Sequence, residues 1–84
     1  STLQVSALDV TLPHDKTLQL WMIKGSAPPR SLGLITQRDG NTFKLPAEAL
    51  DNQTVLAISL EPPGGSPLPG PSGPVVYQGS VRAL

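Results

Sequence analysis

Hydrophobic and polar residues alternate along several short segments of the chain, which is the pattern of strands with one buried face. The strongest such segment spans residues 17–23. Its side chains divide between two faces: Leu18, Leu20 and Met22 on one, and Gln19, Trp21 and Ile23 on the other. We therefore predict a strand over residues 17–23.

The first segment, residues 3–12, changes its alternation partway. Its apolar residues keep one parity up to Ala7 and take the opposite parity from Leu8, which predicts a β-bulge near these two residues. Residues 13–16 (Pro-His-Asp-Lys) then predict a turn, because Pro fixes φ and Asp offers a local side-chain acceptor.

The middle of the chain predicts a hairpin followed by a central strand. Residues 32–36 and 42–45 are two short strand segments, and the Asp39-Gly40 pair between them is the signal of a tight hairpin turn. Residues 46–50 (Pro-Ala-Glu-Ala-Leu) favour a single helical turn at most. Residues 54–60 are low in polarity at both parities, so we predict a central strand that is covered on both faces.

The segment from Pro62 to Pro74 has thirteen residues, of which ten are Pro or Gly. This composition suggests an interdomain linker. However, the composition of residues 75–78 (Val-Val-Tyr-Gln) predicts a strand, and few residues follow them. A lone strand cannot form a domain, so we expect residues 75–78 to pair with the same sheet and residues 62–74 to be an ordered loop. Six short strands in one domain of residues 1–84 then predict an all-β, immunoglobulin-like β-sandwich with a long Pro/Gly loop.

The composition excludes several classes of function. Six basic and six acidic residues balance, and the basic residues are spread singly, whereas nucleic-acid binding needs a clustered basic face. The longest apolar runs, residues 20–23 and 55–58, are far shorter than the ~18 residues of a membrane-spanning helix. With no Cys and one His, the chain offers neither a disulfide nor the ligands of a zinc site. We expect no metal and no cofactor.

Six residues are candidates for structural or loop-pinning roles: Trp21, Glu61, Gly64, Gly65, Ser66 and Tyr77. Trp21 lies mid-strand among apolar residues, so we expect it to anchor the core or the contact between two sheets rather than to bind a ligand. Tyr77 is expected to pack against a strand face.

Glu61 ends a hydrophobic strand and opens the loop of residues 62–74. We expect its carboxylate to accept hydrogen bonds from the backbone of residues 64–66 and from the Ser66 hydroxyl, which would pin the loop. A ligand or cation site is the alternative, but a single carboxylate is a poor site for Ca²⁺, which takes about six or more oxygens.

No catalytic set stands out in the sequence. His14 lies in a polar turn, where we expect a surface residue, and the Gly64-Gly65 pair is not a phosphate loop because no Lys-Ser/Thr follows it. The residue types of a Ser-His-Asp triad do occur in the sequence, as Ser59 or Ser80 with His14 and Asp9. No nucleophile-elbow motif accompanies it, so we expect a protein that is not an enzyme.

Several segments, in their order and spacing, are similar to one known family. The more specific of them are Leu20-Trp21, Leu32-Gly33-Leu34, Ser59-Leu60-Glu61-Pro62, Gly64-Gly65-Ser66-Pro67 and Gly73-Pro74-Val75-Val76. Together they resemble the C-terminal domain of the anti-sigma-K factor family, over roughly residues 17–79.

The resemblance implies both a function and a location. Such proteins have a cytoplasmic N-terminal segment that sequesters an extracytoplasmic-function sigma factor, then one transmembrane helix, then this domain on the periplasmic or extracytoplasmic face of the bacterial inner membrane. Regulated proteolysis of the anti-sigma factor frees the sigma factor. The resemblance therefore implies a regulatory or sensor domain, with a sigma factor and proteases as partners of the full-length protein.

The chain departs from the family pattern at its start, where a further strand or hairpin usually precedes the segment that resembles residues 3–12. We therefore expect a truncated domain that lacks an N-terminal strand. Its open edge would pair with the N-terminal remainder of the same protein, with another chain or with a symmetry mate. Two other functions stay open: an immunoglobulin-like adhesion or interaction module that binds by edge-strand pairing, and a small-ligand domain that uses residues 62–74.

Overall fold

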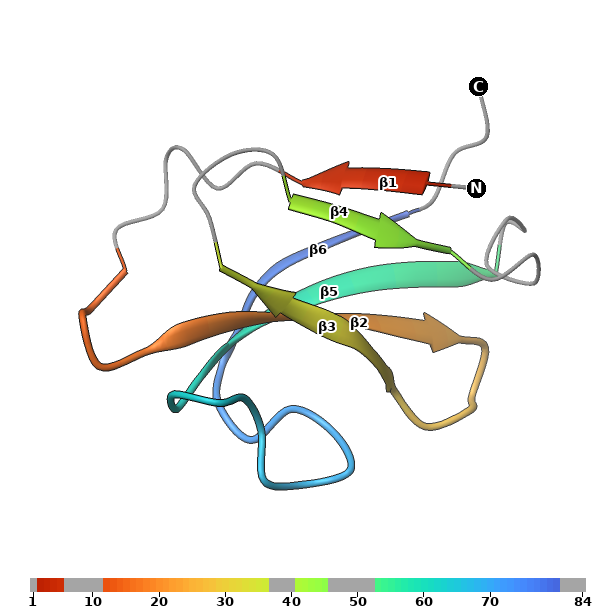
Figure 1. Cartoon of the computed structure of the whole chain (residues 1–84). Coiled ribbons are helices and arrows are strands. Elements are labelled where there is room, and N and C mark those ends of the chain that lie inside the picture. The colour runs from red at the N-terminus through yellow and green to blue at the C-terminus, as the bar shows by residue number, and fades with distance from the viewer. Residues whose placement is uncertain (1, 6–11, 37–40, 46–52, 81–84) are drawn as a thin grey trace.

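The computed structural model describes residues 2–5, 12–36, 41–45 and 53–80, and six strands lie within these ranges (Figure 1). They are β1 (Thr2–Val5), β2 (Thr17–Lys24), β3 (Arg30–Ile35), β4 (Asn41–Lys44), β5 (Thr54–Glu61) and β6 (Val75–Ser80). No helix occurs in the described ranges, and the predicted all-β class is confirmed. The predicted bulge near Ala7, the Asp39-Gly40 turn and the helical turn at residues 46–50 lie outside the described residues.

The strands form two antiparallel sheets, one with the order β1-β4 and one with the order β3-β2-β5-β6. Figure 1 shows the two-stranded sheet above one face of the four-stranded sheet. This two-layer arrangement is compatible with the predicted immunoglobulin-like sandwich, which stays a prediction.

Strands β2 and β5 are the interior strands of the larger sheet. They pair over their full lengths, from Thr17 opposite Glu61 to Lys24 opposite Thr54. On its other side β5 pairs with β6, from Ser59 opposite Val75 to Val55 opposite Ser80. Both the central position of β5 and the return of the chain after the Pro/Gly segment are confirmed.

The core between the two layers is made by one face of the larger sheet. Buried side chains of three strands meet there: Leu18 and Leu20 of β2, Ile35 of β3 and Phe43 of β4. Met22 and Leu45 form a second buried pair, and Leu3 of β1 packs against both groups. Complete burial of such a side chain contributes about 1.5–3 kcal/mol, so this face supplies most of the hydrophobic stabilisation.

The predicted hairpin between β3 and β4 is wrong, because the two strands belong to different sheets. β4 pairs with β1, with Phe43 opposite Leu3. The Phe43 ring lies over β3, since a Cβ built on Gly33 would come 3.1 Å from its Cε1 atom. A turn signal specifies only that the chain reverses. Burial of Phe43 between the layers places β4 above β3 instead of beside it.

Candidate functional site: a cluster that holds the 62–74 loop on the sheet

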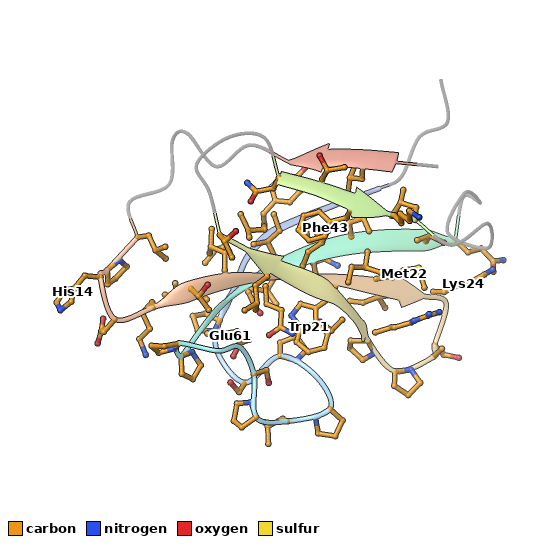
Figure 2. All side chains as sticks on the ribbon, viewed as in Figure 1. His14, Trp21, Met22, Lys24, Phe43 and Glu61 are labelled. Atoms are coloured by element: carbon orange, nitrogen blue, oxygen red, sulfur yellow. The ribbon has the colours of Figure 1, made fainter. Side chains whose placement is uncertain are left out.

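The face of the larger sheet that points away from β1 and β4 is covered by residues 62–74, called here the 62–74 loop (Figure 1). The register of β2 and β5 sets Gln19 opposite Ser59, and Trp21 opposite Ala57. Successive side chains of a strand point to opposite faces, so these residues share one face with Glu61. Figure 2 shows Trp21 and Glu61 on the loop side of the sheet, and Phe43 and Met22 on the other side.

The carboxylate of Glu61 is the centre of this face, and the side chain is fully buried. The Ser59 hydroxyl donates to its Oε2 atom over 2.5 Å, and the Ser72 hydroxyl donates to its Oε1 atom. The backbone N–H of Ser72 lies 3.1 Å from Oε2, and that of Gly73 lies 3.4 Å from it. Donors from β5 and from the end of the loop therefore converge on one carboxylate, which ties the loop to the sheet.

Trp21 extends this arrangement to β2. Its side chain is 2 % exposed, and its indole N–H donates to the Ser59 hydroxyl oxygen over 2.9 Å. Ser59 therefore accepts from Trp21 and donates to Glu61. We call Trp21, Ser59, Glu61, Ser72 and Gly73 the Glu61 cluster.

The position of Trp21 decides between its two expected roles, because the side chain is a buried core residue and not an anchor between the two sheets. Trp21 is buried, but it does not join the two sheets, because it belongs to neither of the buried groups that contain Phe43 and Leu45. The alternation of β2 points Leu20 and Met22 toward the second sheet and Trp21 toward the loop. The indole lies on the loop side of the sheet, away from the second sheet (Figure 2).

Two opposing effects act on the pKa of Glu61. Burial, the largest of them, raises the pKa because it penalises the charged form. Hydrogen bonds from the Ser59 and Ser72 side chains and from the backbone of Gly73 and Ser72 together outweigh burial and lower the pKa below its ordinary value of 4.5. The carboxylate is therefore ionised at neutral pH and stabilised by neutral donors.

The beginning of the loop is held by Gln19 of β2, which is also buried. Its Oε1 atom accepts from the backbone N–H of Ser66 over 2.7 Å, and its Nε2 atom donates to the Ser31 hydroxyl of β3 over 2.7 Å. Gly65, with φ of 100°, lies so close that an added Cβ would come 3.0 Å from the Gln19 Oε1 atom. The loop is thus attached to the sheet near both of its ends.

These contacts overturn the expected donors to Glu61. The N–H of Gly65 donates to the carbonyl of Pro62, the N–H of Ser66 donates to Gln19, and Gly64, with φ of 89°, lies in the same turn. The turn that begins the loop closes on itself and faces β2, so Glu61 instead receives donors from residues 72 and 73.

The end of the loop joins β5 through backbone contacts. The N–H of Leu60 donates to the carbonyl of Pro74 over 2.9 Å. A Cβ built on Gly73 would come 1.9 Å from the backbone oxygen of Leu60, which no side chain can occupy. Glycine is therefore required at residue 73 by close approach of two backbone segments.

The tip of the loop is organised by Ser66. Its hydroxyl donates to the carbonyl of Gly70 over 2.5 Å and accepts from the N–H of Leu68 over 3.1 Å. Leu68 itself is 56 % exposed. Ser66, one of the candidate loop-pinning residues, thus stabilises the tip through its hydroxyl. Its N–H attaches the beginning of the loop to Gln19.

Tyr77 lies on β6, away from the Glu61 cluster, and is 59 % exposed. It stands opposite Ile58, and its ring lies along its own strand, because a Cβ built on Gly79 would come 3.2 Å from its Cε2 and Cζ atoms. Val75 and Val76 on the same strand are exposed as well. Tyr77 therefore belongs to an exposed stretch of β6.

The polar groups of this site form hydrogen bonds that attach the 62–74 loop to the sheet. The Ser59 hydroxyl is buried and bonded to both Trp21 and Glu61, whereas His14 is an exposed turn residue. Asp9 and the side chain of Ser80 lie outside what the structure describes. Among the described residues, no three His, Cys, Asp or Glu side chains gather as metal ligands.

Sequence reasoning found Trp21, Glu61 and Ser66 but missed Gln19, Ser59, Ser72 and Gly73. Ser59 has the same parity as Glu61 in the sequence, which places both on one face of β5. That signal could have identified Ser59 as a neighbour. The path of the loop, which brings residues 72 and 73 back to Glu61, has no comparable local signal.

The fold and the site define a small all-β domain in which a buried carboxylate cluster holds a long loop on one sheet. The chain matches the family model described as anti-sigma-K factor rskA, C-terminal, over residues 1–75, and it belongs to this family. The family supports an anti-sigma factor role and implies a sigma factor as partner. No curated protein and no solved structure matches the chain. In the described ranges, no helix has the length and apolar character required to span a membrane.

Proposed function

We propose that this domain is the extracytoplasmic regulatory or sensor part of a membrane-anchored anti-sigma factor and that it has no enzymatic activity. It lies on the periplasmic or extracytoplasmic face of the bacterial inner membrane. The N-terminal part of the full-length protein holds an extracytoplasmic-function sigma factor until regulated proteolysis releases it. The family match over residues 1–75 is the observation that carries this proposal.

The physical task proposed for the domain is to keep the chain between itself and the membrane ordered. A segment paired as a strand is not a protease substrate until it opens locally. β1 supports such a role, because its four residues pair in register with β4 and Leu3 packs against the core. Chain that enters the domain through β1 would be held, and so protected from proteases, as long as the domain stays folded. We call this protection the shielding role of the domain.

Limited proteolysis of a longer fragment that includes the upstream chain tests this task. We expect the upstream chain to be cut more slowly in the wild-type fragment than in a Trp21→Ala fragment, in which we expect the domain to be unfolded. An unstructured tag on both fragments serves as the control for protease activity. Equal cutting rates of the upstream chain in the two fragments would overturn the shielding role.

A second candidate is an interaction module that binds by strand pairing. It is favoured by β6, which pairs only with β5 among the described strands and exposes Val75, Val76 and Tyr77. Natural edge strands are usually blunted by charge or proline, and β6 contains neither. In this reading the partner is the N-terminal remainder of the same protein or another chain. Titration of that remainder should shift the amide resonances of an edge strand, and unshifted edge strands would exclude the remainder as the partner that pairs with this edge.

A further inference from the structure

We propose that residues 62–80, which comprise the 62–74 loop and β6, open from the rest of the sheet as one cooperative unit, and that the Glu61 cluster sets how often this unit opens. The inference deepens the proposed regulatory function, on which its biological meaning rests.

The loop is held on the sheet by hydrogen bonds near its two ends. Between Glu61 and Arg82 the sequence contains no charged residue, so the loop and β6 contribute no ion pair of their own. The side-chain hydrogen bonds described above attach the loop at Gln19 near its start and at Glu61 near its end. Loss of the Glu61 attachment leaves the bond to Gln19 at the beginning of the loop and, at its end, the backbone bond between Leu60 and Pro74.

The side chains of β6 are only partly packed against the rest of the domain. Its residues Val75, Val76 and Tyr77 are 48 %, 49 % and 59 % exposed. Hydrophobic stabilisation grows with the apolar area removed from water, so these side chains contribute only part of their full burial energy. In the described part of the chain β6 therefore depends mainly on its backbone hydrogen bonds with β5, which is typical of segments that open locally.

The Glu61 cluster and the start of β6 are formed by consecutive residues of the chain. Ser72 and Gly73 donate to Glu61, Pro74 accepts from Leu60, and Val75 stands opposite Ser59. The Ser59 hydroxyl also donates a hydrogen bond to Glu61. The loop attachment and the first pairs of the β5–β6 ladder therefore share the same three residues of β5, so one cannot be released without straining the other.

Opening of this unit would change what the sheet presents to its surroundings. Trp21 and Ala57, which are 2 % and 1 % exposed, would lose the cover of the loop, and β5 would gain a free backbone edge. A free edge is a template for pairing with another strand. Opening of residues 62–80 would thus produce a binding-competent form while β2, β3 and β5 stay paired.

Native-state amide hydrogen exchange of the 84-residue chain, compared between wild type and Ser72→Ala, tests the inference. The variant removes one hydroxyl bond to Glu61 and keeps the backbone N–H donors. We expect the amides of Leu60 and Ser66 and the bonded amides of β6 to exchange about tenfold faster, by a common factor, because a hydrogen bond to a charged group is lost. The bonded amides between β2 and β3 should keep their rates.

Two results would overturn the inference. Faster exchange confined to residues 72 and 73 would show that the loop end moves without β6. An equal increase at every bonded amide, including those between β2 and β3, would show that only global unfolding is affected. Ser26→Ala, at an exposed turn position, is the matched control and should leave all rates unchanged.

A second measurement keeps the test informative for stronger variants. Acrylamide quenching of Trp21 fluorescence reports whether the indole loses its cover, and we expect Ser72→Ala to increase quenching while the sheet remains folded by circular dichroism. Unchanged quenching in a folded variant would contradict the inference. Neither measurement uses an upstream chain or a protease, so its failure would leave the shielding role intact, and failure of the shielding test would leave this unit intact.

Discussion

The two faces of the four-stranded sheet are built on the same strands by different means. The face toward β1 and β4 is covered by apolar side chains such as Leu20 and Phe43. The face toward the 62–74 loop buries Trp21 together with polar groups, among them Gln19 and Glu61. Every buried side-chain nitrogen or oxygen in the described residues has a hydrogen-bond partner.

This difference separates adaptable packing from specific attachment. Apolar cores tolerate changes that preserve volume, because dispersion and burial have little directional character. A buried carboxylate tolerates few changes, because each lost donor leaves a desolvated charge without compensation. We therefore expect the apolar face and the buried Trp21 indole to determine stability, and the polar groups around the Glu61 carboxylate to determine the position of one particular loop.

The largest effect is expected from truncation of Trp21. Trp21→Ala removes the largest buried side chain of the loop face and should destabilise the domain by about 3–5 kcal/mol, as aromatic truncations in cores do. This is a large share of the stability of a domain of this size, so most of the protein should be unfolded. Urea denaturation followed by circular dichroism measures the change.

Leu20→Ala, on the opposite face, provides the comparison for this result. It should cost about 2–5 kcal/mol by the same mechanism. If Trp21→Ala remained folded with near wild-type stability while Leu20→Ala unfolded, the loop face would contribute little to stability, and the difference drawn between the two faces would have to be revised.

A smaller effect is expected from Glu61→Gln, which keeps the volume of the side chain and removes its charge. In the wild-type protein the donors share two carboxylate oxygens, whereas the amide of the variant offers only one acceptor oxygen. We therefore expect the free energy of unfolding to fall by about 1–3 kcal/mol. Proteolysis within the 62–74 loop should also become faster. Asp15→Asn, an exposed turn position, is the charge-matched control. If Glu61→Gln were no more susceptible than Asp15→Asn, the carboxylate would not hold the loop.

The pH dependence of stability should follow from the same carboxylate. Its pKa is lowered in the folded state, so its stabilising contribution is fully present above the ordinary pKa of 4.5 and is lost as the pH falls through the folded-state value. Urea denaturation at a series of pH values should show stability that falls with acidification below about pH 4.5 and a smaller fall in Glu61→Gln. Identical pH profiles for the two proteins would contradict this assignment.

The smallest effect is expected from Tyr77→Ser on β6. Tyr77 is 59 % exposed and stands apart from both buried faces, so the change in stability should stay within about 0.5 kcal/mol. A thermal melt compared with wild type measures it. A loss above about 1 kcal/mol would mean that β6 is packed more tightly than its exposure indicates.

The sequence predicted the strands better than their partners. Alternation located β2 and β5, and the reasoning that a lone strand cannot form a domain returned β6 to the sheet. The prediction of a hairpin between β3 and β4 was wrong. A turn signal indicates that the chain reverses its direction, but it does not indicate whether the next strand joins the same sheet. Glu61 was identified at the start of the loop, but its donors were assigned to residues 64–66 instead of 72 and 73.

By itself the sequence determined the all-β class, the face of β2 on which each side chain lies, and the family. These depend on local periodicity and on motifs that are contiguous in the chain. Only the tertiary structure decided that Trp21 faces the loop and that Ser59, Ser72 and Gly73 meet at Glu61. The physical reason is that these contacts depend on strand register and on the path of a proline-rich loop, which are set by how whole segments pack and not by the residues on either side.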